Sequence, residues 1–295
     1  MKLRFSPFAL LAAFISLLSF QTLAAQTDPM QVTVSIAPQK YFVQAIGGKY
    51  VKVNVMVPPG AEPDDYEPTP RQATELSHSK VYFAIGVPFE TTWLNRFQGS
   101  NPNLTILKTQ QGIEKMPMAY DDDGHRLPAS SGIKDPHIWL SPALVRIQAM
   151  NIRDGLIKAD PAHQQYYRQS YMAFAKKINT IDQEVIDITA KIPAEDNQFM
   201  TFHPAWGYFS TDYGLRQFPI QNEGKQASAK RLKQLIDLAK AQHIKVIFIE
   251  PQFSKEQAGV IAKAIGGKVV AINPLAEDWG KNLITIAKAF KAAAQ

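Results

Sequence analysis

The sequence contains no cysteine. This absence excludes disulfide bonds, thiol catalysis and thiolate metal ligands, so any metal site has to use histidine, carboxylate or amide side chains. It also excludes a lipid anchor on a cysteine at a signal-cleavage site. If the protein is exported, it is therefore expected to diffuse freely in a bacterial periplasm.

Long apolar runs are also absent, apart from one at the beginning of the sequence. Lys2 and Arg4 precede a nearly continuous apolar stretch at 8–20, and Thr22-Leu23-Ala24 offers small residues for cleavage. This order is typical of a secretory signal peptide, and the stretch is shorter than a transmembrane helix requires. We predict that residues 1–25 are a signal peptide and that the mature protein is soluble in the periplasm.

Charge of one sign is not concentrated in any part of the chain. The formal net charge of +6 includes Lys2 and Arg4, which leaves +4 for the mature protein. This excess is scattered lysine rather than a basic stripe, which argues against nucleic acid as a partner. The 270 residues that follow position 25 are too many for most single cores and suit two domains.

The first half of the mature sequence alternates between strand and helix patterns. Alternating or continuous apolar runs predict strands, and amphipathic spacing between them predicts helices. This order favours a parallel sheet with helices on both faces. The predicted strands are 32–36, 51–57, 81–85 and 104–107, and the predicted helices are 39–46, 70–79, 89–97 and 142–158.

One long helix is predicted in the middle of the chain. Asp160 and Pro161 suit the N-cap and first position of a helix, and no helix breaker follows before Pro193. Some ~30 helical residues would form a rod of roughly 45 Å. The rod could be a coiled-coil dimer seam, but its place between two α/β halves favours packing along both of them. Its apolar seam is Tyr167, Tyr171, Phe174, Ile178, Ile181, Val185 and Ile188.

The second half repeats the strand–helix pattern, which predicts a bilobed monomer. Two parallel-sheet α/β lobes would be joined by the long rigid helix, with a cleft between them. We assign residues 26–158 to the N-terminal lobe, 159–192 to the linking helix and 193–295 to the C-terminal lobe. The predicted strands are 198–202, 216–220, 244–249 and 268–272, and the predicted helices are 205–213, 228–242, 255–265 and 279–294.

Two histidines stand in rigid surroundings. His137 lies between Pro136 and a Ser141-Pro142 helix start, and proline restricts the backbone on both sides of it. A lone histidine in such a place is more often structural than a ligand. His203, which precedes a proline and follows a predicted strand, changes that balance in favour of a shared metal site.

Ligands of parallel α/β sheets bind beyond the carboxyl ends of the strands, and polar residues gather there in this sequence. Imidazole with carboxylate suits Zn²⁺ and other first-row divalent ions. We therefore predict a metal site in the cleft between the lobes. The residues that follow predicted strands, or in one case precede a helix, are Asp64, Asp65, His137, His203, Glu250 and Asn273.

Structural roles remain open for several of these polar residues. Asp64 and Asp65 lie in a proline-rich turn sequence and could be turn residues only. His125 lies in an acidic stretch at 121–125 that could capture metal loosely or simply be solvated. We expect the remaining three histidines, His78, His163 and His243, to be solvated on helices.

The motifs of the chain together resemble the metal-specific solute-binding proteins of bacterial ABC transporters, especially their zinc-uptake branch. The resemblance covers essentially the whole mature chain. It implies two α/β lobes joined by one long helix, a divalent metal bound between the lobes, and delivery of that metal to an ABC permease in the inner membrane. The motifs that carry it are 57–70, 135–142, 201–209, 248–253 and 273–275.

Carried over residue by residue, the resemblance implies a metal shell of His137, His203, Asp64 and Asn273. Histidine at 203, where manganese members carry glutamate, favours zinc. Asp64 stands where the family has histidine, and Asn273 stands where it has aspartate. These two exchanges leave the ligand charge of −1 unchanged, although an amide is a weak zinc ligand and Asn273 could orient a water or Asp64 instead.

Two functions other than zinc transport are compatible with these residues: binding of a different metal species and hydrolysis. The same fold could bind another divalent ion, such as Mn²⁺ or Fe²⁺, or a chelated metal. A zinc hydrolase would need an open coordination position and a general base, and Glu250 could be imagined in that role. The sequence has no His-Glu-x-x-His helix or comparable catalytic set, so we predict no catalytic residues and no enzymatic activity.

Overall fold

The computed structural model describes residues 28–118, 134–221 and 226–294 of the chain. The predicted signal peptide and the acidic stretch at 121–125 lie outside these ranges. Within them, no helix has the length and apolar character needed to span a membrane.

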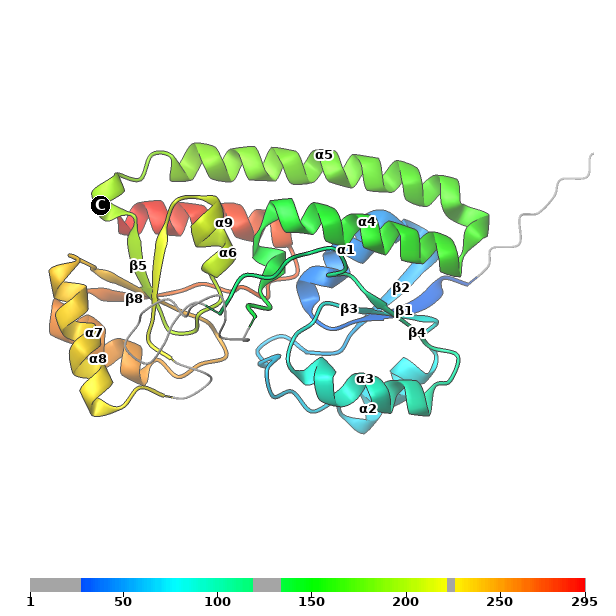
Figure 1. Ribbon diagram of the computed structural model, residues 1–295, viewed down its shortest axis with the longest axis horizontal. Coiled ribbons are helices and arrows are strands. Elements are labelled where there is room, and N and C mark those ends of the chain that lie inside the picture. Colours follow the sequence, from blue (N-terminus) through cyan, green and yellow to red (C-terminus); the bar gives the residue numbers. More distant parts are fainter. Residues whose placement is uncertain (1–27, 119–133, 222–225, 295) are drawn as a thin grey trace, which may run out of the picture.

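The N-terminal lobe is built on a four-stranded parallel sheet in the order β2-β1-β3-β4. In Figure 1, α1 and α4 cover one face of this sheet, and α2 and α3 cover the other. The strands are β1 (Met30–Val34), β2 (Val51–Val55), β3 (Val81–Ala84) and β4 (Thr105–Lys108). The helices are α1 (Ala37–Gly47), α2 (Pro70–Ser77), α3 (Phe89–Ser100) and α4 (Pro142–Ala159).

The C-terminal lobe repeats this plan with a parallel sheet in the order β6-β5-β7-β8. Helices α7 and α8 pack on one face of the sheet, and α9 lies on the other (Figure 1). The strands are β5 (Gln198–Thr201), β6 (Arg216–Pro219), β7 (Val246–Ile249) and β8 (Lys268–Ala271). The helices are α6 (Gly207–Asp212), α7 (Ala229–Ala241), α8 (Glu256–Ile265) and α9 (Trp279–Ala293).

Helix α5 (Gln164–Thr189) spans both lobes along one side of the molecule (Figure 1). Its 26 residues correspond to about 39 Å at ~1.5 Å per residue. Its apolar seam is buried against α1, α4 and α9 of the same chain, so it is not the seam of a coiled-coil dimer. The fully or almost fully buried seam residues are Tyr167, Phe174, Ile178, Ile181 and Val185.

The helix begins later than the sequence predicts. The first turn, Pro161–His163, is a 3-10 helix rather than part of α5. The Asp160 side chain does not cap this turn, because its Oδ2 atom is engaged by His163 Nδ1 at 2.7 Å and by Tyr167 OH at 2.6 Å. His163 is therefore half-buried and paired, and our expectation of a solvated histidine there is wrong.

The C-terminal helix α9 contacts both lobes. Its first residue, Trp279, packs edge-on against Phe42 of α1 with ring centroids 5.3 Å apart. Farther along, Phe290 stacks on Phe199 of β5 at 4.2 Å. A Cβ atom at Gly280 would stand 2.5 Å from Ile181 of α5, so glycine is what allows the two helices to approach so closely. Helices α5 and α9 therefore hold the two lobes together along one side of the molecule.

Candidate metal centre

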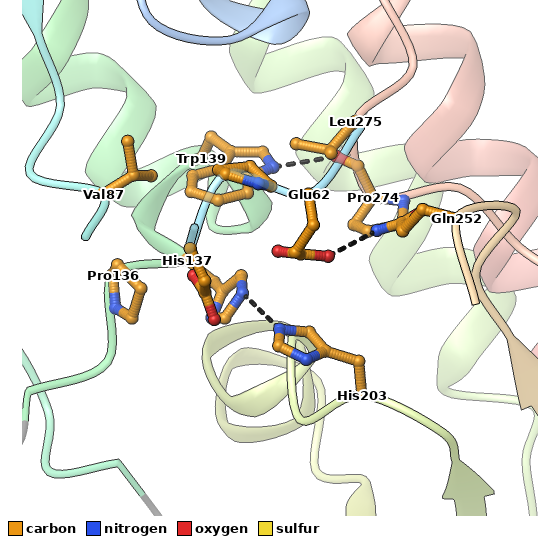
Figure 2. Close-up of a pocket in the computed structure, with 11 residues that line it drawn as sticks. Glu62, Val87, Pro136, His137, Trp139, His203, Gln252, Pro274 and Leu275 are labelled. Atoms are coloured by element: carbon orange, nitrogen blue, oxygen red, sulfur yellow. Dashed lines mark hydrogen bonds between the residues drawn. The ribbon is translucent and has the colours of Figure 1, made fainter. Parts of the chain in front are cut away.

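A small pocket between the two lobes collects side chains from loops at the carboxyl ends of the strands. Glu62 and Asp64 come from the segment after β2, and His137 comes from the segment before α4. The C-terminal lobe contributes His203 after β5 and Gln252 after β7. Figure 2 shows the labelled members of this group turned toward one another.

His137 is oriented by a neighbouring carboxylate. Its backbone N–H donates to Asp135 Oδ1 at 2.9 Å, and its Nδ1 lies 2.7 Å from the same oxygen. A short 3-10 turn, Ile138–Leu140, follows directly and is completely buried. Since a carboxylate accepts hydrogen bonds, Nδ1 carries a ring proton, and Nε2 is left to bind a metal ion through its lone pair.

Asp135 is itself held by the opposite lobe. The hydroxyl of Tyr208 in α6 donates to the Asp135 carbonyl at 3.1 Å and accepts from the Met116 N–H at 3.0 Å. Asp135 Oδ2 approaches Gly207 so closely that a Cβ atom there would stand 2.6 Å from it. The carboxylate behind His137 therefore has little freedom to turn away.

His203 is oriented in the same way by different partners. Its Nδ1 lies 3.0 Å from Gln221 Oε1, an acceptor, so this ring also carries its proton on Nδ1. Its backbone N–H donates to Glu250 Oε2 at 3.2 Å, and its ring stacks on Phe253 with centroids 5.3 Å apart. The Nε2 atom that remains points toward His137 (Figure 2).

The two Nε2 atoms lie 3.2 Å apart. Because each ring also holds a proton on Nδ1, the two Nε2 atoms can lie this close only with a cation between them, either a metal ion or one further proton on His137. Two nitrogens bound at ~2.0–2.1 Å to one tetrahedral zinc ion are about 3.3 Å apart, which matches this spacing. The pair is thus arranged for one shared ion.

The pKa values of the two imidazoles are driven in opposite directions. Burial alone would lower the pKa of His137, but the carboxylate of Asp135, with Asp64 and Glu62, raises it. Burial and the charge of His137 lower the pKa of His203 to about 3. When no metal is bound, at most one proton occupies the space between the rings, and it belongs to His137.

Two carboxylates complete the donor set. One oxygen each of Glu62 and Asp64 and a ring nitrogen of His203 lie within 4.8 Å of one another. Burial, reinforced by the charge of Asp64, raises the pKa of Glu62 to about 7, and burial also raises the pKa of Asp64. Both carboxylates are thus destabilised as anions until a cation lies between them.

The loop that carries these carboxylates is anchored on both sides. Phe89 donates its N–H to the Pro63 carbonyl at 3.3 Å, between the two acidic residues. The Tyr66 ring packs edge-on against Phe89, and its hydroxyl donates to Gln72 Oε1 at 2.7 Å. The proline-rich stretch is therefore an ordered support for Glu62 and Asp64, and not only a surface turn.

Of the four predicted ligands, the structure brings three into the pocket and leaves the fourth outside it. Asn273 is not among the residues that line the pocket. Its Oδ1 accepts from the Leu275 N–H at 2.9 Å, and its carbonyl accepts from Asn282 at 2.7 Å. It thereby orders Pro274 and Leu275, which do line the pocket, and Pro274 accepts a hydrogen bond from Trp139 Nε1 at 2.8 Å.

Sequence reasoning missed Glu62 and Gln252. Glu62 and Asp64 are two residues apart in a stretch punctuated by prolines, and side chains at this spacing in extended backbone point the same way. That signal could have identified Glu62. Gln252 carries no comparable signal, since its role depends on how the two lobes meet. Asp65 and the two helix-end histidines His78 and His243 are exposed.

Two parallel α/β lobes joined by one long helix, with a donor set enclosed between them, define a bilobed solute-binding protein. The chain belongs to the family described as zinc-uptake complex component A, periplasmic (ZnuA), which matches residues 32–293.

Two similar proteins match this chain along most of its length. The iron-binding protein YfeA of Yersinia pestis is 29% identical over 93% of this chain and 91% of its own length. The high-affinity zinc uptake system protein ZnuA of Bacillus subtilis is 29% identical over 88% of this chain and 85% of its own.

Solved structures agree with this placement. A crystal structure of ZnuA superposes with a TM-score of 0.85 at 40% identity and covers 91% of this chain and 100% of its own. The periplasmic zinc-binding protein TroA of Treponema pallidum superposes at 0.80 with 20% identity, over 90% of this chain and 99% of its own. At 20% identity, the similarity to TroA is evidence of a shared fold only. The predicted fold class of two α/β lobes on one long helix is confirmed.

Proposed function

We propose that this protein captures a divalent transition metal ion, zinc first of all, between its lobes and delivers it to an ABC permease. The observation that carries the proposal is the pair of facing Nε2 atoms of His137 and His203, 3.2 Å apart with both Nδ1 protons committed elsewhere. One metal ion can replace the proton between these two atoms, and their spacing suits zinc.

The proposed metal shell is His137, His203, Asp64 and Glu62. It replaces the Asn273 of our sequence-based shell by a second carboxylate, because Asn273 has its side-chain oxygen engaged by Leu275. Two anionic oxygens balance the charge of a divalent ion. Two imidazoles favour zinc, whereas carboxylate oxygens also suit Mn²⁺ and Fe²⁺, so these ions are the second candidates. The iron-binding name of the Yersinia pestis relative supports keeping Fe²⁺ among them.

The hydrogen bonds that Glu250 accepts favour a binding role over a catalytic one. Its two carboxylate oxygens accept hydrogen bonds from the His203 backbone and from Trp206 Nε1, each at 3.2 Å. A hydrolase would need a free base aimed at a metal-bound water. Glu250 instead supports the backbone of a ligand.

The family to which the chain belongs is periplasmic. We propose the same location for this protein, reached through the signal peptide at residues 1–25, and a monomer as the transporting form. The internal packing of the α5 seam supports a monomer, because it removes the surface that a coiled-coil dimer would use.

Metal content and competitive titration of the purified mature protein test the proposal. We expect one zinc ion per chain after dialysis and tighter binding of Zn²⁺ than of Mn²⁺ or Fe²⁺. The variant His203→Ala should lose this stoichiometric zinc, and His78→Ala, an exposed histidine outside the pocket, should keep it. A wild-type chain that retains no metal ion, or one that binds only chelated metal, would contradict the proposal.

A further inference from the structure

We propose that Gln252 determines metal specificity by holding one carboxylate oxygen of Glu62, so that Glu62 binds the ion through its other oxygen only. Gln252 would thereby keep the number of ligand atoms low and favour zinc over manganese. This inference rests on the proposed function, since it assumes that Glu62 is a ligand.

The two side chains come from opposite lobes. Glu62 follows β2 and Gln252 follows β7, and they are 190 positions apart in the sequence. Gln252 Nε2 donates to Glu62 Oε2 at 3.1 Å, as the dashed line in Figure 2 shows. Both residues line the pocket and both are half-buried. The hydrogen bond therefore lies at the pocket and not on the outer surface.

Gln252 belongs to a turn that also positions a metal ligand. Phe253 donates its N–H to the Glu250 carbonyl at 3.2 Å, which closes the turn around Gln252. Glu250 accepts from the His203 backbone, and the Phe253 ring stacks on the His203 ring. The amide of Gln252 is consequently fixed relative to His203, and through it Glu62 is placed relative to the C-terminal lobe.

This placement has a chemical consequence for the ion. A carboxylate can bind a metal through one oxygen or through both. With Oε2 engaged by Gln252, Glu62 offers Oε1, and with two imidazoles and one oxygen of Asp64 the ion has four ligands. Four-coordinate tetrahedral geometry suits zinc, whereas manganese prefers six ligands rich in oxygen. Releasing Oε2 would raise the coordination number and shift the preference toward manganese.

The test compares wild type, Gln252→Leu and a matched control in which another glutamine loses the same kind of bond. Gln183 is that control, since its Nε2 donates to Asp187 at 2.9 Å on the exposed side of α5, away from the pocket. Competitive titration gives the ratio of zinc affinity to manganese affinity, and the visible spectrum of the Co²⁺-loaded protein reports the coordination number. Gln252→Met is a second variant of similar length, because its thioether cannot donate to Glu62.

We expect Gln252→Leu and Gln252→Met to lower the affinity for zinc by about tenfold or more, the usual effect of removing a residue that orients a ligand. Because the freed oxygen of Glu62 is useful to manganese, the affinity for manganese should fall less, so that the zinc-to-manganese ratio drops. Their Co²⁺ absorption should weaken as the tetrahedral site gains a ligand, while Gln183→Leu should match wild type in both measurements. A variant that binds zinc with the wild-type ratio and spectrum would overturn the inference, and so would an equal loss of both metals.

Failure of the proposed function is seen separately, in the wild-type titration. If the unmodified chain binds neither zinc nor manganese, the proposed function and this inference both fail. If it binds zinc stoichiometrically and the Gln252 variants behave like wild type, only the inference fails.

Discussion

Each histidine of the pocket has one nitrogen committed to the protein and one left for a ligand. Asp135 and Gln221 accept from the two Nδ1 atoms, at 2.7 and 3.0 Å. These partners fix the tautomer and the ring plane before any ion arrives, which lowers the cost of ordering the site on binding. The orientation of both rings is therefore set before the metal ion binds.

The dependence of binding on pH follows from these protons. Groups that are protonated without metal must release their protons when the ion binds, so affinity falls as pH drops through their pKa values. The pKa of Glu62 is raised to about 7 and that of His137 is also raised, whereas His203, at about 3, is already neutral. The loss of binding below neutral pH is therefore governed by Glu62 and His137 and not by His203.

We expect the logarithm of zinc affinity, measured by competitive titration, to fall with a slope approaching two per pH unit below pH ~7, since two protons are displaced. The variant Glu62→Gln removes one of these protons and should reduce the slope by about one. A slope that is flat in wild type, or unchanged in Glu62→Gln, would contradict the assignment of Glu62.

The two positions that depart from the family pattern should respond differently to mutation. Asp64 lines the pocket, while Asn273 stabilises the turn at Leu275. Asp64→Ala should weaken zinc binding by about 100-fold or more, because it removes a ligand. Asn273→Ala should weaken it by only about tenfold, the low end of the roughly 10–100-fold cost of removing a positioning residue. The exposed neighbour Asp65→Ala serves as the control. Titration data that reverse this order would restore Asn273 as a ligand.

At the scale of helices and strands, the sequence allows most of the architecture to be predicted. In the part of the chain that the structure describes, the strands and helices lie within a few residues of the predicted ranges, because apolar periodicity and capping residues such as Ser141 are local signals. The predicted helix start at Asp160 is wrong, because the Asp160 side chain accepts a hydrogen bond from Tyr167 and does not cap the helix. The role of Gln252 depends on the meeting of two lobes, and local patterns do not encode that geometry.

The seam of α5 makes a prediction about stability. Ile178 is completely buried, while Met172 on the same helix is 58% exposed. Ile178→Ala should lower the free energy of unfolding by roughly 2–5 kcal/mol because it leaves a cavity, and Met172→Ala should change it by less than ~0.5 kcal/mol. Urea denaturation of the metal-free proteins measures both. An Ile178→Ala protein as stable as wild type would mean that α5 is not packed along the lobes in solution.

At the scale of the whole molecule, the lobes are joined by more than α5. Trp279 Nε1 donates to the Trp139 carbonyl at 2.6 Å, and Ser141 at the start of α4 donates to Asp212 of α6 at 2.5 Å. These contacts, together with α9, resist a wide hinge opening. Metal binding is therefore expected to change the shape of the molecule only slightly.

Solution scattering and thermal denaturation check this expectation together. The radius of gyration should be the same with and without zinc, within error. The melting temperature should rise, because a ligand present at 100 times its Kd stabilises the folded state by about 2.7 kcal/mol. A compaction of several ångströms on binding would indicate a flexible hinge between the lobes.

The central claim is that one zinc ion lies between His137 and His203 with Glu62 and Asp64 as its oxygen ligands. The most direct measurement is anomalous diffraction at the zinc absorption edge from crystals of the zinc-loaded mature protein. We predict a single strong peak at ~2.0–2.1 Å from both Nε2 atoms and at ~2.0–2.2 Å from one oxygen of each carboxylate. A peak elsewhere in the molecule, or a peak coordinated by Asn273 in place of Glu62, would contradict the account.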